Sequence, residues 1–552
     1  MDIVTDVLVI GAGTAGLRSA IAAADQGVSV LLISKSEIEK SGTTNADVAE
    51  MAGFNAAQAN NDYEIDLHYQ DMVNAGQEVV DKELAMVVAQ NAPSVMKELQ
   101  DWGVAFEEEE GTLFTFQSCF SSYPRTHVIK GHGRQIAVSL RSEVSKRKNI
   151  SILTGATIVG LLRGDFQCIG AYCVLHGEEL TVHAKATILA SGGCGMAFKR
   201  SFSPPDVAGG AYEMAYSAGA VIQNIEFMQI GIGFSHPLVN IFNGYLWQGH
   251  PVLTDAGGNE IFSRMLPKGV TANDVYDAHV WHFPFSSKDN SKYLEIAINR
   301  TIAQGLGSPN GGVHADLRHM DDAYIANLSH DTGIAHMWPL ARDFLRNRGV
   351  DLLKETVEVA CFQHAMNGGV KIDHHSESTL PGLYAVGECA GGPHGADRLG
   401  GNMFVTSLVY GRIAGEHAAK RSMQVSSLPG MDVASVEEQQ KKYASMRKRV
   451  DISPLLSELQ DKAQSSLLVD RTERGLEEML QFSETVEDTI ASASEGKLPE
   501  TKIYDLLSIA KTTWLISKSA LERKESRGSH HRSDYPDKDA RFDRIIEQVI
   551  RS

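Results

Sequence analysis

DVLVIGAGTAGLRSAIAAADQGVSVLLISKS, residues 6–36, predicts a buried strand, a glycine-rich turn, a helix and a second strand. The apolar run before the turn shows no polar alternation, as is usual for a parallel strand buried on both faces. Gly11, Gly13 and Gly16 follow in GxGxxG spacing, which allows a tight turn, a close approach of a pyrophosphate and close helix–strand packing. Because strand, helix and strand surround the motif, we expect a Rossmann-like α/β domain that binds a dinucleotide.

Two later segments indicate how the dinucleotide is held. The second strand ends in Ser34, Lys35 and Ser36, without the acidic residue that commonly binds an adenosine ribose, so this end does not select between NAD and FAD. Residues 41–53, SGTTNADVAEMAG, are rich in small and hydroxyl side chains and suit a second stretch of backbone around an extended cofactor. Residues 185–195, KATILASGGCG, read as another apolar strand that ends in glycines. Such a return of the chain is typical of a flavoprotein, in which several segments contact FAD.

The composition excludes several classes of protein. At 552 residues the chain exceeds what one core usually supports, so roughly two to four structural units are expected. The net charge of −18 argues against binding to nucleic acid or to an anionic membrane. The six cysteines include no CxxC pair, so we predict no metal centre held by this chain. The chain starts with a strand pattern rather than a signal peptide, and no apolar run approaches the roughly 20 residues of a membrane span. We expect a cytoplasmic protein without direct membrane insertion.

A glycine-rich loop lies much later in the chain. Residues 391–404, GGPHGADRLGGNMF, contain five glycines, which stand on both sides of Arg398, and they follow the segment GLYAVGECA at 382–390. Glycine is costly in ordered backbone, so such a run marks turns or a close approach of the main chain to a flat or phosphorylated ligand. Taken alone, the loop fits a surface turn as well as it fits a ligand contact.

Further segments recur in a known order and spacing. They are LQDWGVAF (99–106), ILASGGCG (188–195), AYSAGAVIQNIEFMQ (215–229), HADLRHM (314–320), HAMNGG (364–369), GLYAVGECA (382–390), HGADRLGGN (394–402) and ALERKESRGSHHRSDYP (520–536). With the N-terminal motif, they make the chain resemble, nearly end to end, the flavoprotein subunit of the succinate dehydrogenase, fumarate reductase and L-aspartate oxidase family. The resemblance implies a discontinuous Rossmann-like FAD-binding domain, an inserted α+β capping domain and a helical C-terminal domain.

The resemblance also implies which residues contact the cofactor. Glu388 would reach the flavin ribityl chain, and the backbone of Asn402, Met403 and Phe404 would lie against the isoalloxazine. The expected FAD contacts are Gly11, Ala12, Gly13, Thr14, Ala15, Gly16, Ser34, Lys35, Ser36, Ser41, Gly42, Thr43, Thr44, Ile158, Ser191, Gly192, Gly193, Glu388, Asn402, Met403 and Phe404. The histidine that carries covalent FAD in respiratory members would sit near Gly42, so we expect non-covalent FAD.

The resemblance further implies an anion site. Arg398 matches an arginine that grips a substrate carboxylate, a task that suits a forked and permanently charged guanidinium. His364 matches a histidine that is a second donor to the same carboxylate. Arg125 resembles an arginine that lines the approach to the flavin, although a solvated surface arginine fits equally well, and His394 is left open between a site residue and a structural one. The candidate catalytic residues are Arg398, His364, Lys288, His236, Arg125 and His394.

The substrate side departs from the family pattern. Gly231 falls where a histidine is expected, and His236 with the following proline is either the same pair shifted by an insertion or unrelated. The arginine that donates a proton in fumarate reductases has Lys288, followed by an aspartate, as its nearest match. Lysine can transfer protons but cannot bind two oxygens in a planar fork. Residues 247–251, WQGHP, replace Arg-Gly-Glu-Gly-Gly. We expect the far end of the substrate to differ from that of fumarate.

The expected function is transfer of hydride or electrons between FAD and a small anionic substrate, expected to be a dicarboxylate. Because the chain has no cysteine cluster, a separate iron–sulfur subunit is expected to exchange the electrons. Three alternatives stay open. Residues 35–42, KSEIEKSG, and Trp247 are similar to adenylylsulfate reductase flavoproteins, which act on a sulfur substrate. An L-aspartate-oxidase-like enzyme would pass electrons to oxygen, and a non-catalytic FAD-binding subunit would turn over no substrate.

The predicted domains follow the same resemblance. They are a first part of the FAD-binding domain at 1–230 with a helical insertion at about 60–105, a capping domain at 231–349, a second part of the FAD-binding domain at 350–425 and a helical C-terminal domain at 435–552.

Overall fold

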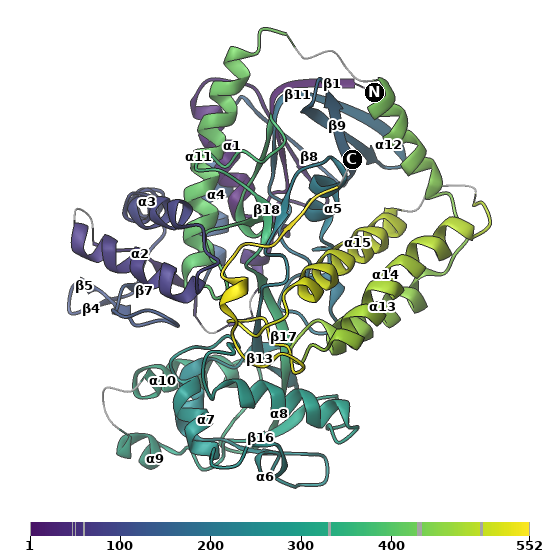
Figure 1. Cartoon of the computed structure of the whole chain (residues 1–552). Coiled ribbons are helices and arrows are strands. Elements are labelled where there is room, and N and C mark those ends of the chain that lie inside the picture. Colours follow the sequence, from purple (N-terminus) through teal and green to yellow (C-terminus); the bar gives the residue numbers. More distant parts are fainter. Residues whose placement is uncertain are drawn as a thin grey trace.

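The protein folds into three parts that pack together (Figure 1). A main sheet with its helices lies at the top of the view, a second sheet with helices lies at the bottom, and a group of C-terminal helices flanks both on the right. This arrangement confirms the mixed α/β fold with an inserted second sheet and a helical C-terminal part. The computed structural model describes residues 2–46, 48–49, 51–58, 61–328, 333–427, 433–496 and 501–550, with only the backbone described at 333–336.

The main sheet carries the glycine motif at its centre. Its strand order is β8-β2-β1-β11-β10-β9, and β19 also pairs with β11. The pairs among β8, β2, β1, β11 and β19 are parallel, whereas β10 and β9 are antiparallel to their neighbours. The first strand is fully buried from Val7 to Ile10, as its unbroken apolar run predicts. The strands are β1 (Asp2–Ile10), β2 (Val30–Ser34), β8 (Ile150–Thr154), β9 (Ala156–Gly164), β10 (Gln167–Leu175), β11 (Glu178–Leu189) and β19 (Leu383–Ala385).

Helices cover the main sheet. The helix that follows the glycine motif packs along the long helix that follows the glycine-rich loop, and both contact the sheet. The helices of this part are α1 (Thr14–Asp25), α4 (Arg134–Ser145), α5 (Gly210–Ser217) and α11 (Asn402–Gln424). The α1 sequence is rich in alanine on its packed side, and small side chains allow this close approach. The first turn of α1 lies against the middle of α11, where a Cβ on Gly411 would lie 2.9 Å from the carbonyl oxygen of Ala15.

Between β2 and β8 the chain leaves the main sheet. Two helices, a small sheet of order β3-β7-β6 and a hairpin make up this excursion. The elements are β3 (Gly53–Asn55), α2 (Asp62–Gly76), α3 (Lys82–Asp101), β4 (Glu108–Glu109), β5 (Thr112–Leu113), β6 (Thr115–Phe116) and β7 (Thr126–Val128). Asp81 caps α3 by accepting hydrogen bonds from the N–H groups of Glu83 and Leu84. Both helices lie within the segment 60–105 in which a helical insertion was expected.

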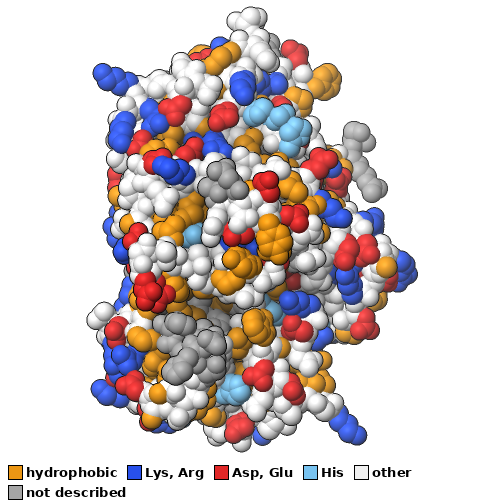
Figure 2. Space-filling view, turned by 90° about the vertical axis from the view of Figure 1, so that its left-hand side faces the viewer, with side chains coloured by type: hydrophobic (Ala, Val, Ile, Leu, Met, Phe, Trp, Pro, Cys, Tyr) orange, Lys and Arg blue, Asp and Glu red, His pale blue; other side chains and the backbone are white. Residues whose placement is uncertain are grey.

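The second sheet belongs to the cap. Its order is β14-β13-β17-β16-β15, and the long central strands β13 and β17 pair antiparallel. On the face shown in Figure 2, acidic and basic side chains are interspersed, and the surface is hollowed between the part above and the cap below. The cap elements are β13 (Met228–His236), β14 (Asn240–Ile241), β15 (Val252–Thr254), α6 (Phe262–Met265), α7 (Ala272–His279), α8 (Lys292–Ala303), β16 (Val313–Asp316), α9 (Asp322–Asn327), α10 (Gly333–Arg346) and β17 (Val357–Met366).

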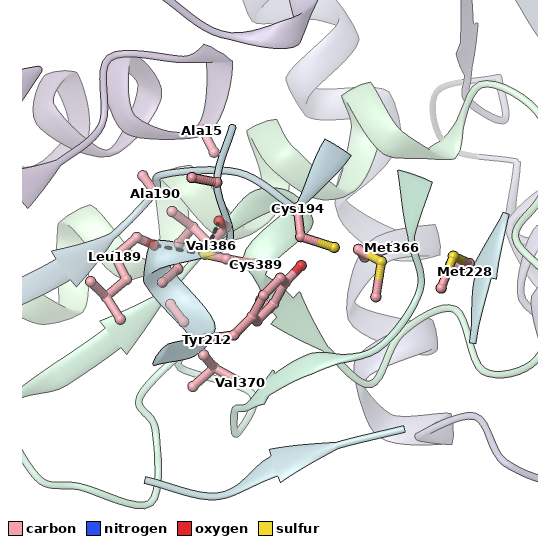
Figure 3. Close-up of a cluster of buried hydrophobic side chains, with 14 of the residues drawn as sticks. Ala15, Leu189, Ala190, Cys194, Tyr212, Met228, Met366, Val370, Val386 and Cys389 are labelled. Carbon is pink, nitrogen blue, oxygen red and sulfur yellow. Dashed lines mark hydrogen bonds between the residues drawn. The ribbon is translucent and has the colours of Figure 1, made fainter. Parts of the chain in front are cut away.

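The strand β17 lies beyond residue 349, so the cap sheet draws on residues that the sequence analysis gave to the second FAD-binding part. Figure 3 shows a cluster of buried apolar side chains in which Leu189 and Ala190 lie at one side and Met366 and Met228 at the other, with Cys194 and Tyr212 between them. The sulfur of Cys389 lies 3.3 Å from the carbonyl oxygen of Leu189 in this core. The predicted domain boundaries stay a prediction.

The C-terminal helices are α12 (Val433–Ser445), α13 (Ile452–Ser466), α14 (Glu473–Ser492) and α15 (Thr501–Glu522). The segment after α15 is fixed by buried ion pairs: Arg523 contacts Glu226 at 2.7 Å and Glu525 at 3.0 Å. Because Glu226 lies two residues before β13, these pairs hold the C-terminal segment against the base of the cap. A fourth sheet contains β12 (Ile222–Gln223), β18 (Gly369–Lys371), β20 (Ala390–Gly391) and β21 (Glu547–Gln548). Among the helices in the described part of the chain, none is long and apolar enough to cross a membrane.

Candidate active site

A cleft opens at the carboxyl ends of β1, β2 and β11, the edge at which ligands bind in sheets of this type. It contains about 1180 Å³ of empty space, part of which is open to solvent. The expected cofactor residues that line it are Gly11, Ala12, Gly13, Thr14, Ala15, Ser34, Lys35, Ser36, Ser41, Gly42, Thr43, Thr44, Ile158, Ser191, Gly192, Glu388 and Met403.

The glycine motif shapes one wall of the cleft. Gly11 has φ of +109°, and a Cβ there would lie 2.4 Å from the carbonyl oxygen of Ala190. A Cβ at Gly16 would lie 1.9 Å from the carbonyl oxygen of Gly11. Glycine is therefore required at both positions, and the close turn leaves the N-terminus of α1 facing the cleft. Free backbone N–H groups at a helix N-terminus favour a phosphate.

Some expected cofactor residues lie outside the lining of the cleft: Gly16, Gly193, Asn402 and Phe404. Gly193 and Phe404 of this set are tightly packed. A Cβ on Gly193 would lie 2.2 Å from a carboxylate oxygen of Glu388, and a Cβ on Gly133 would lie 2.8 Å from the ring of Phe404. Direct cofactor contacts at these four residues stay a prediction.

The cleft also has a wall that the sequence analysis missed. Lys35 forms a 2.6 Å ion pair with Asp505 of α15, and Ser36 donates a 2.6 Å hydrogen bond to Asp206. Two carboxylates thus reach the end of β2, where the sequence itself has no acidic residue. Because Lys35 and Asp505 are 470 positions apart, no local pattern could reveal this contact.

Glu388 presents a buried carboxyl group to the cleft. Burial raises the pKa of Glu388 to about 7, although a 3.0 Å hydrogen bond from the backbone N–H of Met366 opposes this. The Ser191 hydroxyl nearby is buried and has no hydrogen-bond partner among the described residues. Buried polar groups without partners are costly, so a ligand with hydroxyl groups would complete this end of the cleft.

Arg398 forms a second, separate cluster with residues of the cap strands. Its Nη2 donates to Oε1 of Gln229 at 2.5 Å and lies 3.4 Å from Nε2 of His364. Its Nη1 donates to the carbonyl oxygen of Leu399 at 3.0 Å. Gln229 in turn donates through Nε2 to the carbonyl oxygen of Arg398 at 3.0 Å, which fixes the orientation of the amide. The residue pair predicted from sequence, Arg398 and His364, is thus brought together.

The charges of this cluster favour an anion. Burial lowers the pKa of Arg398 to about 10, so the guanidinium stays protonated at neutral pH. Burial and the charge of Arg398 lower the pKa of His364 to about 3, so the imidazole is neutral. Because an N–H of Arg398 faces Nε2 of His364, that nitrogen is the acceptor and the ring proton lies on Nδ1. Arg398 Nε and His364 Nδ1 are both buried without a partner in the described part of the chain.

His394 and Arg125 are buried in the part of the chain that surrounds this cluster. His394 lies 3.4 Å from the hydroxyl of Thr406, and burial together with Arg398 lowers the pKa of His394 well below its usual range. Arg125 forms a buried ion pair with Asp71 of α2, while its Nε and Nη1 have no partner among the described residues. A catalytic role of either residue stays a prediction.

The structure does not bring His236 or Lys288 into the cluster. His236 is the exposed last residue of β13, whereas Gln229 lies near the other end of the same strand. The strand therefore carries His236 away from Arg398, and it does not replace the histidine missing at Gly231. Lys288 has its Nζ 4.6 Å from the centre of the Phe120 ring, so it lies at the rim rather than inside.

Comparisons with known proteins agree with this geometry. The FAD binding domain family matches residues 6–404, and the family described as fumarate reductase flavoprotein C-term matches residues 456–545.

The chain belongs to the flavoprotein family of succinate dehydrogenases, fumarate reductases and L-aspartate oxidases.

Its relatives in this family match over almost the whole chain. A fumarate reductase (CoM/CoB) subunit of Methanothermobacter marburgensis is 30% identical, covering 98% of this chain and 96% of the relative. An L-aspartate oxidase of Yersinia pestis is 28% identical, covering 97% of this chain and 96% of the relative. The solved structure of Mycobacterium smegmatis Sdh1 in complex with UQ1 superposes with a TM-score of 0.81 and 28% identity, covering 98% of this chain and 91% of that chain.

Membership of the flavoprotein family confirms FAD as the cofactor and an FAD-dependent oxidoreductase as the class of enzyme. The cleft fits this cofactor. The turn at Gly11 and the N-terminus of α1 suit its phosphates, and the unpaired hydroxyl of Ser191 and the carboxyl of Glu388 suit its hydroxyl groups. The individual contacts stay predictions.

We expect this flavoprotein to hold its FAD without a covalent bond. Gly42, nearest to the position of the covalent histidine, has φ of +86°, and a Cβ there would lie 2.7 Å from Cα of Gly13. The backbone therefore leaves no room for a side chain. Acid precipitation of the holoprotein should release FAD into the supernatant, where its absorbance is measured. Flavin that stays in the washed pellet would contradict this prediction.

Proposed function

We propose that the protein transfers a hydride between bound FAD and a small anionic substrate whose carboxylate is held by Arg398. The observation that carries this proposal is the pair of buried donors without acceptors in the described part of the chain, Arg398 Nε and His364 Nδ1, beside the FAD cleft. An unsatisfied buried donor costs about 1–3 kcal/mol, so an anionic ligand that accepts from both would stabilise the site.

The residues of the site bind and orient the substrate. Arg398 supplies a fixed positive charge, and its planar fork restricts how a carboxylate can lie. Gln229 holds one arm of that fork through a 2.5 Å hydrogen bond, so the guanidinium cannot rotate freely. His364 is neutral and donates from Nδ1 without adding charge. When bound, FAD supplies the two-electron chemistry by giving or taking a hydride.

The source of the proton for reduction is a separate question. Lys288 is the candidate from the sequence, and its electrostatic interactions with Cys119 and Asp397 indicate that it lies close to the site. From its position at the rim it can exchange protons with solvent. We keep Lys288 as a proposed proton donor at the rim of the site.

We also propose that electrons pass through a separate iron–sulfur protein. Support comes from the relatives, since the chain covers 96% of a protein named as one subunit of a fumarate reductase. By this reasoning the chain is itself one component of an assembly. The cytoplasmic location expected from the sequence stays a prediction.

An anaerobic experiment tests the proposed function. The FAD of the holoprotein is reduced chemically, candidate oxidants are added, and the return of the oxidised flavin absorbance is followed by stopped flow. We expect one or more unsaturated carboxylates to reoxidise the flavin.

Other outcomes would support the alternatives. Reoxidation by adenylylsulfate alone would support the sulfur substrate, and reduction of the oxidised flavin by L-aspartate would support an amino acid oxidase. If no compound of these classes changes the flavin, the protein binds FAD without catalysis, and the proposed function is wrong.

A further inference from the structure

One face of the cap sheet contacts Arg398, and its side chains change from polar to apolar with distance from Arg398. Side chains alternate across a strand, so Gln229, Gly231 and Gly233 of β13 share one face. On the neighbouring strand β17, Phe362 pairs directly with Gly231 and shares that face. His364 lies at an irregularity of the ladder, and its ring reaches the same side, 3.4 Å from Arg398 Nη2. The polar side chains, Gln229 and His364, stand at the end near Arg398. Beyond them the face has two glycines and a phenyl ring.

Two further phenyl rings lie over these glycines. A Cβ on Gly231 would lie 2.1 Å from the ring of Phe283, and a Cβ on Gly233 would lie 2.6 Å from the ring of Phe202. The space that a histidine side chain would take at position 231 is therefore filled by Phe283. The Phe202 ring also stacks on Phe362, with ring centres 4.7 Å apart and planes 12° apart. The apolar end is thus an aromatic cluster of three rings, Phe202, Phe283 and Phe362.

The aromatic cluster begins directly beside the anion-binding pair. The ring of His364 contacts Phe202 and Phe283 edge-on, with ring centres 5.7 and 5.6 Å away. When Arg398 and His364 bind the carboxylate of a molecule, the atoms next to that carboxylate therefore contact phenyl rings. Buried apolar surface contributes about 25 cal/mol per Å², so an apolar group is favoured there.

The loop that carries Phe283 is held in place by hydrogen bonds to residues outside it. Its backbone N–H donates to the sulfur of Cys119 at 2.9 Å, and the N–H of Phe285 donates to the carbonyl oxygen of Ile230 at 2.8 Å. The loop is thus held along β13, and this places the Phe283 ring over Gly231. A second carboxylate at this place would lose its hydration against aromatic carbon, which is strongly unfavourable.

We infer that the substrate is a monocarboxylate with an apolar body: a 2-enoate whose carboxylate lies on Arg398 and His364 and whose alkyl or aryl group lies toward the aromatic cluster. This inference rests on the proposed function and replaces the dicarboxylate expected from the sequence. In the reaction the carbon–carbon π bond breaks and two C–H bonds form. The β carbon receives the hydride from reduced FAD, and the α carbon receives a proton that comes ultimately from water.

The test compares two substrates of matched shape. Fumarate and (E)-4-methylpent-2-enoate differ in that a branched alkyl group replaces one carboxylate. Both are offered to the anaerobically reduced holoprotein, and the second-order rate constant of flavin reoxidation is measured for each. We expect the alkyl enoate to exceed fumarate by about tenfold or more, the range that a few buried methyl groups provide. A rate constant for fumarate equal to or above that of the alkyl enoate would overturn the inference.

A binding measurement supplies a readout that does not depend on turnover. The dissociation constants of both acids are measured from the change they cause in the absorbance of oxidised FAD, and the same order is expected. Phe283→His should strengthen the binding of fumarate relative to the alkyl enoate by about tenfold, because a polar ring replaces aromatic carbon. Phe283→Leu keeps an apolar side chain and should leave the ratio of the two dissociation constants unchanged. An unchanged ratio in Phe283→His, with full FAD content, would contradict the assignment of the apolar end.

The outcomes separate this inference from the proposed function. If fumarate is preferred, the inference is wrong and the proposed function stands. If neither acid binds or reoxidises the flavin, and the wider series of carboxylates also fails, both are wrong.

Discussion

Arg398→Lys should lower kcat/KM for the carboxylate substrate by about 100-fold or more, the loss that misplacement of a substrate by about 1 Å produces. Lysine keeps the positive charge but has no planar fork. It would also lose the 2.5 Å hydrogen bond to Gln229 that orients the present side chain. FAD content and the visible spectrum should be unchanged, because Arg398 does not line the FAD cleft. Steady-state kinetics and flavin absorbance measure the two effects on the same preparation.

A matched control is available in the cap. Arg318 is exposed and pairs with Asp316 only two residues away, so Arg318→Lys changes the same chemical group away from the site. It should retain the kcat/KM of the unmodified protein. Near-normal turnover in Arg398→Lys would show that the anion is bound elsewhere.

Gly13→Asp should weaken FAD binding strongly while leaving the fold intact. Gly13 is the N-cap of α1, in extended backbone, and a Cβ there would meet nothing nearer than Cα of Gly42 at 3.6 Å. Aspartate is a favoured N-cap residue, better than glycine by roughly a few tenths of a kcal/mol, so α1 should not be destabilised. The added carboxylate would, however, stand where the cofactor phosphates are expected. We expect FAD binding to weaken by about 100-fold or more, equivalent to about 2.7 kcal/mol.

Gly13→Asn separates charge from size. Asparagine caps a helix about as well as aspartate and has nearly the same volume, but it is neutral. It should weaken FAD binding less than aspartate does. FAD per chain is measured after gel filtration, and the melting temperatures of the apoproteins check the fold. Stoichiometric FAD in Gly13→Asp would mean that the phosphates do not approach this helix.

The cofactor side of the molecule was predictable because its signals are local. The turn at Gly11 needs a positive φ and leaves no room for a Cβ. Glycine meets both requirements, so a short stretch of sequence is enough to predict the turn. The same holds for Glu388, which stands in a short segment between a strand and a glycine-rich loop. The contact between Lys35 and Asp505 was not predictable, because it depends on how the C-terminal helices dock.

The substrate side was predictable only in part. Arg398 and His364 were identified from resemblance, and the structure brings them within 3.4 Å of each other. Gln229 lies in one of the recurring motifs but was not singled out, because nothing in the sequence says which side chain orients an arginine. Phe283 was missed because its ring fills a space left by Gly231, about fifty positions earlier. His236 was misplaced because the sequence does not show how far β13 runs toward solvent.

The ion pair between Lys35 and Asp505 has a consequence for biosynthesis. The end of β2, with Lys35, emerges from the ribosome 470 residues before Asp505 of α15. At about 5–20 residues per second, the two are separated by about 25 to 90 seconds of translation. During that interval this wall of the cofactor site is unfinished in the nascent chain. The wall of the cleft at the end of β2 is therefore completed only when α15 has been made and has docked against it.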